Sequence, residues 1–250
     1  MQPDAWQFLQ NYTPARIARG RTGHSLPTVE LLKFQADHAQ ARDAVYSELA
    51  ISELTTSIRK VFDLHVFNFK SKIKNRTQYL QRPDLGRTLS SQSKEELMGI
   101  NCSESDICFV IADGLSAQAV NQNALPILEN LIPKIKEINW KIAPICIVEQ
   151  GRVAIGDEIG FLLKSEIIVI FIGERPGLTS PDSMGTYISF RPYVGMTDEN
   201  RNCVSNIRPD GMNINLATEK ILYLLTEIKT KKLSGVTLKD EYKTNLPLNK

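Results

Sequence analysis

The chain has 250 residues, of which 42% are hydrophobic and 23% are charged, and its formal net charge is +2. This composition is typical of a globular protein with one large domain or two small ones. The balanced charge gives no reason to expect nucleic acid or a membrane surface as a partner, and no apolar run approaches the length of a membrane span.

The N-terminus has neither a positive patch nor an apolar core, so we expect no signal peptide. The four cysteines show no C-x-x-C spacing, and two of them fall within predicted buried strands. They are Cys102, Cys108, Cys146 and Cys203. This cysteine usage favours a reduced, cytoplasmic protein.

The first hundred residues are predicted to form a mainly helical region. Three arginines lie beside two glycines within residues 13–23, where they either hold an anion or a partner's carboxylates or are simply solvated. A helix is expected to begin at Thr28, a suitable N-cap residue. Its expected apolar face consists of Leu31, Phe34, Ala41, Val45 and Leu49. Residues 66–94 are basic and polar, and we interpret them as a connecting segment with short helices or turns.

Residues 101–250 alternate between strand and helix patterns. Three apolar runs, at 107–112, 143–148 and 167–172, predict strands that are buried on both faces. Helical patterns connect these runs, and Pro126 and Pro133 are expected to kink or end parts of the first helix. A strand–helix–strand order predicts right-handed crossovers and a parallel sheet. The expected fold class is therefore α/β, a Rossmann-like parallel sheet with flanking helices, preceded by the mainly helical region.

Each of the three predicted strands is followed by a polar loop that contains glycine. The carboxyl ends of parallel strands share one edge of the sheet, and in open α/β sheets ligands bind there. The last of these loops, Gly173–Gly177, contains Glu174 and Arg175, although taken alone it could equally be an ordinary surface loop. The polar stretch between residues 178 and 211 is expected to be an ordered, ligand-facing loop.

Motifs for independent catalysis are missing. The sequence contains neither a G-x-G dinucleotide fingerprint nor a G-x-x-x-x-G-K-[ST] phosphate loop. The run Gly114–Gln118 departs from the nucleophile elbow at its last position, so we interpret Ser116 as a helix cap. His24, His38 and His65 have no metal-binding spacing. We therefore predict a binding edge with no catalytic residue and no metal ligand of its own.

Seven short segments of the sequence are distinctive. They are Thr13–Ile17, Ser25–Thr28, Ala112–Ser116, Gly156–Glu158, Gly173–Leu178, Ser180–Ser183 and Asn202–Arg208. The most specific are G-E-R-P-G-L and the later N-C-V-S-N-I. In this order the segments resemble the small (light) subunit of ethanolamine ammonia-lyase, and the resemblance extends from about Thr13 to Asp240.

The resemblance implies one subunit of an adenosylcobalamin-dependent lyase of ethanolamine catabolism, which converts ethanolamine to acetaldehyde and ammonia. It implies a hetero-oligomer, a heterododecamer, in which a large barrel subunit holds the substrate and the catalytic residues. Residues 1–100 are then expected to contact the large subunit, and residues 101–250 to form a Rossmann-like domain that covers the cobalamin. Such a chain is expected to be inactive alone.

The family positions that contact cobalamin correspond to Val153, Glu174 and Cys203 in this sequence. Glu174 can accept hydrogen bonds from the amide groups of the corrin rim, and Val153 can pack on the apolar macrocycle. Cys203 is small enough to let the backbone approach, although a plain buried thiol is the alternative. The resemblance also implies that the cofactor keeps its own benzimidazole below the cobalt. The D-x-H-x-x-G motif of proteins that supply a histidine instead fails at Asn68.

Two parts of the chain depart from the family. Many relatives have a longer N-terminus, linked in some to packaging in a bacterial microcompartment, whereas this chain reaches the T-P-A-R-I segment within about a dozen residues. We therefore expect a cytoplasmic protein and doubt a microcompartment. Residues 64–94 match the family poorly, and we place no site there.

The residues leave two other functions open. An independent α/β enzyme for a nucleotide or phosphorylated substrate would need a phosphate loop, and none is present. A non-catalytic assembly subunit with a vestigial pocket would be favoured if Glu174 or Cys203 were replaced, and both are present.

Overall fold

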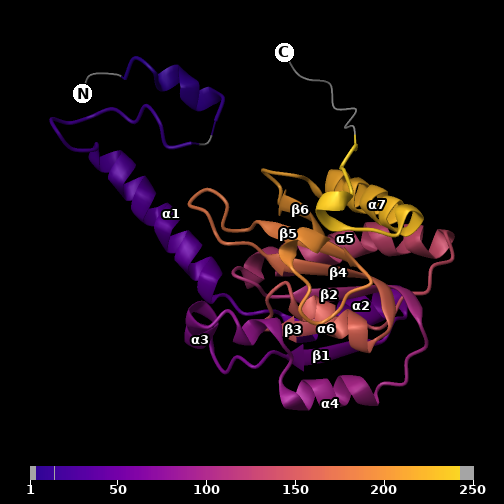
Figure 1. The fold of residues 1–250 in the computed structure, drawn as a ribbon. Helices are drawn as coiled ribbons and strands as arrows, with labels where there is room; N and C mark the ends of the chain where they lie inside the picture. The colour runs from indigo at the N-terminus through magenta and orange to yellow at the C-terminus, as the bar shows by residue number, and fades with distance from the viewer. Residues whose placement is uncertain (1–3, 14, 243–250) are drawn as a thin grey trace.

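The computed structural model describes residues 4–13 and 15–242, and its centre is a six-stranded sheet (Figure 1). The strands are β1 (Val66–Lys70), β2 (Ser105–Ala112), β3 (Ile145–Glu149), β4 (Ser165–Gly173), β5 (Met184–Phe190) and β6 (Arg201–Ile207). Their order across the sheet is β1-β3-β2-β4-β5-β6. The first four are parallel, whereas β5 runs antiparallel to both β4 and β6. The α/β class and the three predicted parallel strands are thus confirmed.

Helices cover both faces of this sheet. They are α2 (Ile51–Phe62), α5 (Ala117–Glu137) and α7 (Ile214–Lys231) on one face, with α4 (Ser91–Gly99) and α6 (Ile155–Leu162) on the other. An apolar core lies on each face of the sheet, and the side chains of β2 point alternately into the two cores. Phe109 packs in the core beneath α2, α5 and α7, and Val110 packs in the core beneath α4 and α6. A strand covered on both sides needs apolar residues at nearly every position, which explains the continuous apolar runs in the sequence.

Helix α5 begins after Ser116, the residue that the sequence indicates as a helix cap. Ser116 is its N-cap, and the Ser116 hydroxyl oxygen accepts a hydrogen bond from the backbone N–H of Ala119 (3.2 Å). Pro126 and Pro133 lie inside α5 and do not end it, because the helix runs without a break from Ala117 to Glu137, whereas the alternative of a kink stays a prediction. Packing of its apolar side against the sheet and α7 compensates for the missing N–H donors.

Three strands were not predicted. Residues 66–94 are not only a connecting segment, because β1 adds to the sheet beside β3, followed by α3 (Arg76–Gln81). The stretch 178–211 is not one long loop, because it contains β5 and β6. In β6 buried and exposed residues are mixed, as expected for an outer strand with one solvent-facing side. The division of the chain near residue 100 stays a prediction, although α2 and β1 pack into the same core as the later strands.

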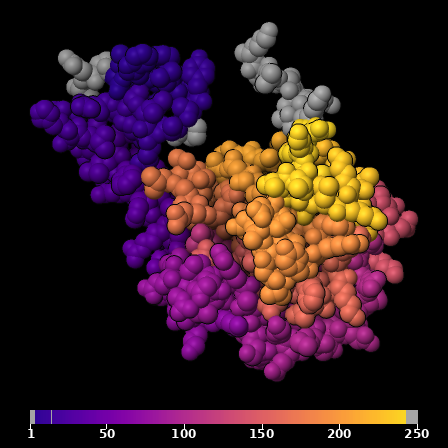
Figure 2. Space-filling view, viewed as in Figure 1, coloured from indigo at the N-terminus to yellow at the C-terminus, as the bar shows by residue number. Residues whose placement is uncertain are grey.

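The N-terminal arm, residues 4–13 and 15–46, stands away from this body (Figures 1 and 2). It contains a 3-10 helix at Gln7–Asn11 and the helix α1 (Thr28–Tyr46). Arg16 and Arg19 form ion pairs with Asp37 and Glu30 of α1, respectively, so the charges of these two arginines are neutralised within the arm. Pro14, which belongs to one of the distinctive segments, and residues 1–3, which bear on the signal-peptide prediction, lie outside the described residues.

The predicted apolar face of α1 is not buried against the body. Ala44 is its one buried residue, and Leu49 lies beyond the end of the helix. Large apolar side chains are exposed instead at Val29, Leu31, Leu32 and Phe34. Each helical residue advances by about 100°, so these four positions point to different sides of α1. Among the described residues, no helix has both the length and the apolar character that crossing a membrane requires.

Candidate functional site

The three predicted polar loops meet at the carboxyl edge of the parallel strands. Asp113, directly after β2, lies where the helices that follow β2 and β3 turn to opposite faces of the sheet. Its carboxylate accepts hydrogen bonds from the backbone N–H groups of Gln150 (2.9 Å) and Gly151 (3.0 Å), which follow β3. Asp113 therefore ties the β2 and β3 loops together at the edge where α/β sheets commonly bind ligands, and with Arg76 and Gln150 it lines a cavity of about 640 Å³.

Two glycines bring the β2 and β4 loops into contact. Gly114 has a φ of +60°, and a Cβ atom at this position would lie 2.3 Å from the carbonyl oxygen of Gly173. A Cβ atom at Gly173 would lie 2.0 Å from the carbonyl oxygen of Ser116. Because neither position has room for a side chain, the Leu115 N–H can donate to the Gly173 carbonyl at 2.9 Å. This contact fixes the position of the backbone directly before Glu174.

Asp113 is an unusual carboxyl group. Burial raises its pKa to about 6, against the opposing effect of its backbone hydrogen bonds and of Arg76, whose Nη1 lies 3.6 Å from the carboxylate. Burial also lowers the pKa of Arg76. These two groups sit beneath the edge and hold the loops together.

Glu174 is half-buried and is held by three donors. Its Oε2 accepts from the Ser183 hydroxyl (2.6 Å) and from the Asn206 backbone N–H (3.2 Å), and its Oε1 accepts from the Ser205 hydroxyl. The carboxylate therefore joins the start of β5 to the end of β6. Each carboxylate oxygen can accept about two hydrogen bonds. Oε1 thus keeps one acceptor position for a ligand.

Val153 and Glu174, but not Cys203, line one cavity of about 400 Å³ at this edge. Its other linings include Gly114, Arg152, Tyr187 and Ser205. Cys203 lies within β6, not in a loop, as the register partner of Tyr187. It is exposed at the surface, so the alternative of a buried thiol is wrong, although partial burial still raises the pKa of this thiol. A second cavity of about 630 Å³ adjoins the first and shares Arg152 and Val153 with it.

Sequence reasoning missed Arg152 and Tyr79 at this edge. Tyr79 belongs to α3, in the segment where no site was expected, and it is fully buried with its hydroxyl donating to the Gly151 carbonyl (3.0 Å). The Arg152 guanidinium lies 4.0 Å from the centre of its ring. A single arginine and a single tyrosine form no motif, so no pattern in the sequence could have paired them.

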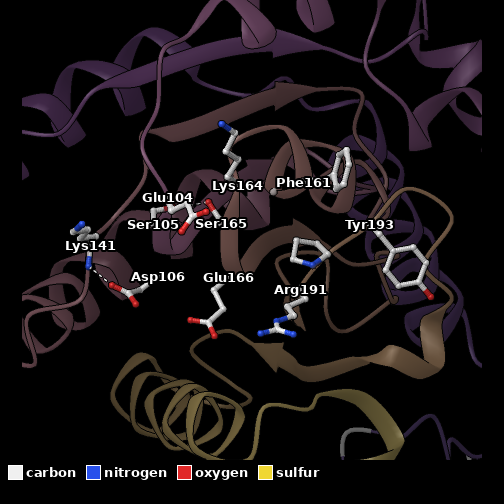
Figure 3. Close-up of a pocket in the computed structure, with 12 residues that line it drawn as sticks. Glu104, Ser105, Asp106, Lys141, Phe161, Lys164, Ser165, Glu166, Arg191 and Tyr193 are labelled. Carbon is white, nitrogen blue, oxygen red and sulfur yellow. Dashed lines mark hydrogen bonds between the residues drawn. The ribbon is translucent and has the colours of Figure 1, made fainter.

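Another cavity, of about 860 Å³, lies at the opposite edge of the sheet (Figure 3). Glu166 and Arg191 project into it from the ends of β4 and β5. Lys229 of α7 forms ion pairs with both Asp106 and Glu166, so these two acidic side chains are already paired within the chain. Within residues 4–13 and 15–242, no group of three His, Cys, Asp or Glu residues could hold a metal ion.

Comparisons with known proteins cover almost the whole chain. Residues 3–239 match the family model described as ethanolamine ammonia-lyase light chain (EutC). The chain is 49% identical over 239 residues to the ethanolamine ammonia-lyase small subunit of Azotobacter vinelandii, covering 94% of this chain and 88% of the relative. The small subunits of Pseudomonas fluorescens strain Pf0-1 and Ralstonia nicotianae are 49% and 47% identical, each over 94% of this chain and over 87% and 88% of the relative.

Proposed function

The chain belongs to the ethanolamine ammonia-lyase light chain family, and we propose that it is the small subunit of an adenosylcobalamin-dependent ethanolamine ammonia-lyase. The match over residues 3–239 carries this proposal. The reaction would convert ethanolamine to acetaldehyde and ammonia, with the substrate and the catalytic groups on a large subunit. This chain would be inactive alone.

The carboxyl edge fits one side of a cobalamin. Val153 offers an apolar contact for the macrocycle, and Glu174 keeps an acceptor position for an amide N–H of the corrin rim. Two adjoining cavities that share Val153 suit a broad ligand half-covered by this chain. When bound, the cofactor supplies the radical chemistry, while the residues of this chain bind it, orient it and exclude water. We propose Val153, Glu174 and Cys203 as its contacts, within a Rossmann-like domain of residues 101–250.

The N-terminal arm supports the proposed large-subunit contacts of residues 1–100. Leu32 is 58% exposed and Trp6 is 64% exposed, in an arm that packs little of its apolar surface on the body. We propose that the large subunit covers these exposed apolar side chains in the assembly. A heterododecamer in the cytoplasm is the assembly we propose.

Reconstitution tests this function. The chain, a family large subunit and their mixture are each assayed with adenosylcobalamin for acetaldehyde and ammonia release, and cofactor binding is followed by absorbance titration. We expect co-elution, tight cofactor binding and turnover for the mixture alone. Turnover by this chain alone would refute its role as a non-catalytic subunit. If the mixture co-elutes and turns over ethanolamine but binds the cofactor no more tightly than the large subunit alone, a pure assembly subunit would be favoured instead.

A further inference from the structure

We propose that Arg152 is a further cofactor-binding residue, which donates a hydrogen bond to the carbonyl oxygen of a carboxamide on the corrin rim. This inference rests on the proposed function. It adds a donor to a site whose three expected residues offer an acceptor, an apolar contact and a thiol.

The Arg152 side chain is held in place from three directions. Its guanidinium lies over the Tyr79 ring at 4.0 Å, and its Nη2 donates to the Tyr79 carbonyl oxygen at 3.0 Å. A Cβ atom at Gly86 would lie 2.8 Å from the Cγ of Arg152, so only glycine lets the stem pass at that point. A side chain fixed in advance loses little freedom when a ligand binds.

One end of the guanidinium is left for a ligand. Within the described part of the chain, Arg152 forms no ion pair, whereas Arg76, which lies over the same ring at 4.5 Å, faces Asp113. The Nε atom of Arg152 is buried without a partner, and Nη2 is used by Tyr79. Nη1 is not buried and has no hydrogen-bond partner among the described residues. Since Arg152 lines both cavities, the residue that carries this unused donor is one that the two cavities share.

The chemistry of the opposite wall identifies the group that fits. Glu174 lines the same cavity of about 400 Å³ and keeps a free acceptor position, yet no hydrogen bond joins Glu174 to Arg152. A primary carboxamide carries both an N–H donor and a carbonyl acceptor, so it can satisfy both walls. A phosphate carries acceptors and would be repelled by Glu174. The pair therefore favours the amide-bearing corrin rim over the phosphate of the nucleotide loop.

The test compares two cofactors on the complex assembled from this chain and the large subunit. Adenosylcobalamin has both the rim amides and the phosphate, whereas adenosylcobinamide has the rim amides and lacks the nucleotide loop. Dissociation constants are measured by absorbance titration for the parent, Arg152→Gln and Arg152→Lys, with co-elution and thermal melts as folding checks. Arg82→Gln is the matched control, because Arg82 is exposed, pairs with Asp84 and lines neither cavity.

We expect Arg152→Gln to raise both dissociation constants by about 10- to 150-fold, the range for losing a hydrogen bond to a charged group. Arg152→Lys keeps the charge and one donor, so it should bind more tightly than Arg152→Gln and more weakly than the parent. Arg82→Gln should match the parent. A loss confined to adenosylcobalamin would assign Arg152 to the phosphate, and parental affinities in both variants would show no contact; either result overturns the inference. Failure of the parent complex to bind either cofactor would instead refute the proposed function.

Discussion

Replacing Glu174 by Gln separates its observed role as a link between β5 and β6 from its proposed role as a contact for the cofactor. The substitution preserves the shape of the side chain and exchanges one oxygen for an NH₂ group. If the remaining oxygen takes the place of Oε2, it still accepts from Ser183 and Asn206. The new NH₂ group then faces Ser205, whose hydroxyl can accept as well as donate. All three contacts within the protein can thus be kept.

The two roles therefore respond by different amounts. Exchanging charged for neutral hydrogen bonds lowers the free energy of unfolding by about 1 kcal/mol, since charged hydrogen bonds are roughly twice as strong as neutral ones. For the cofactor, the acceptor left on Oε1 becomes a donor that opposes an amide N–H. The expected loss in binding free energy is about 1.5–3 kcal/mol, or about a 10- to 150-fold rise in the dissociation constant.

Absorbance titrations and thermal melts of the assembled complex measure these two quantities. Glu129→Gln is the control, because Glu129 is an exposed glutamate of α5, away from the cavity. We expect weakened binding and a nearly unchanged melting temperature for Glu174→Gln alone. A large drop in melting temperature with parental affinity would refute the reasoning and make Glu174 a structural residue only.

Three further predictions concern other parts of the chain. Because burial raises the pKa of Asp113 from 3.8 to about 6, its contribution to stability is present at low pH and is lost as pH rises from about 4 to about 6. Chemical denaturation measures the free energy of unfolding of the parent and of Asp113→Asn at each pH. The difference, parent minus variant, should fall by on the order of 3 kcal/mol as the pH rises through this range. A rise in this difference would show that the hydrogen bonds and Arg76 dominate the pKa of Asp113. The histidines His24, His38 and His65 are exposed, and replacing each by Ala should leave the electron paramagnetic resonance signal of cob(II)alamin unchanged. A splitting of this signal that changes with isotopic labelling of histidine would show that a histidine binds the cobalt and would contradict the prediction. Leu32→Glu should abolish co-elution with the large subunit without changing the melting temperature of the isolated chain, whereas Gln40→Glu, also exposed on α1, should not; equal co-elution would exclude this part of α1 from the interface.

The sequence identified the parts of the sheet that are buried on both faces. The strands β2, β3 and β4 are continuous apolar runs, and a short run of this kind is typical of a strand that is buried on both faces. The strand β1 was missed because V-F-N-F-K is short and lies in a basic segment. The strand β5 was missed because Gly185, Thr186 and Ser189 interrupt its apolar run although they are buried, and β6 was missed because its exposed polar residues resemble a loop.

The candidate site was predicted at the level of the loops and not of their contacts. Parallel strands necessarily bring Asp113 and Glu174 to one edge, and this followed from the pattern alone. The hydrogen bonds from Ser183 and Ser205 to Glu174 depend on the antiparallel pair β5–β6, which was not predicted. Tyr79 is distant from Arg152 in the sequence, so their contact depends on how α3 folds back onto the edge.

The exposed apolar side chains of the N-terminal arm also bear on how a cell keeps subunits in proportion. A copy that has not yet met its partner displays Val29, Leu31 and Leu32 to the surroundings. Chaperones and proteases recognise exposed hydrocarbon of this kind, and unassembled chains are continuously removed on that basis. The arm would then act as a marker of incomplete assembly, so that the lifetime of each copy depends on the supply of its partner.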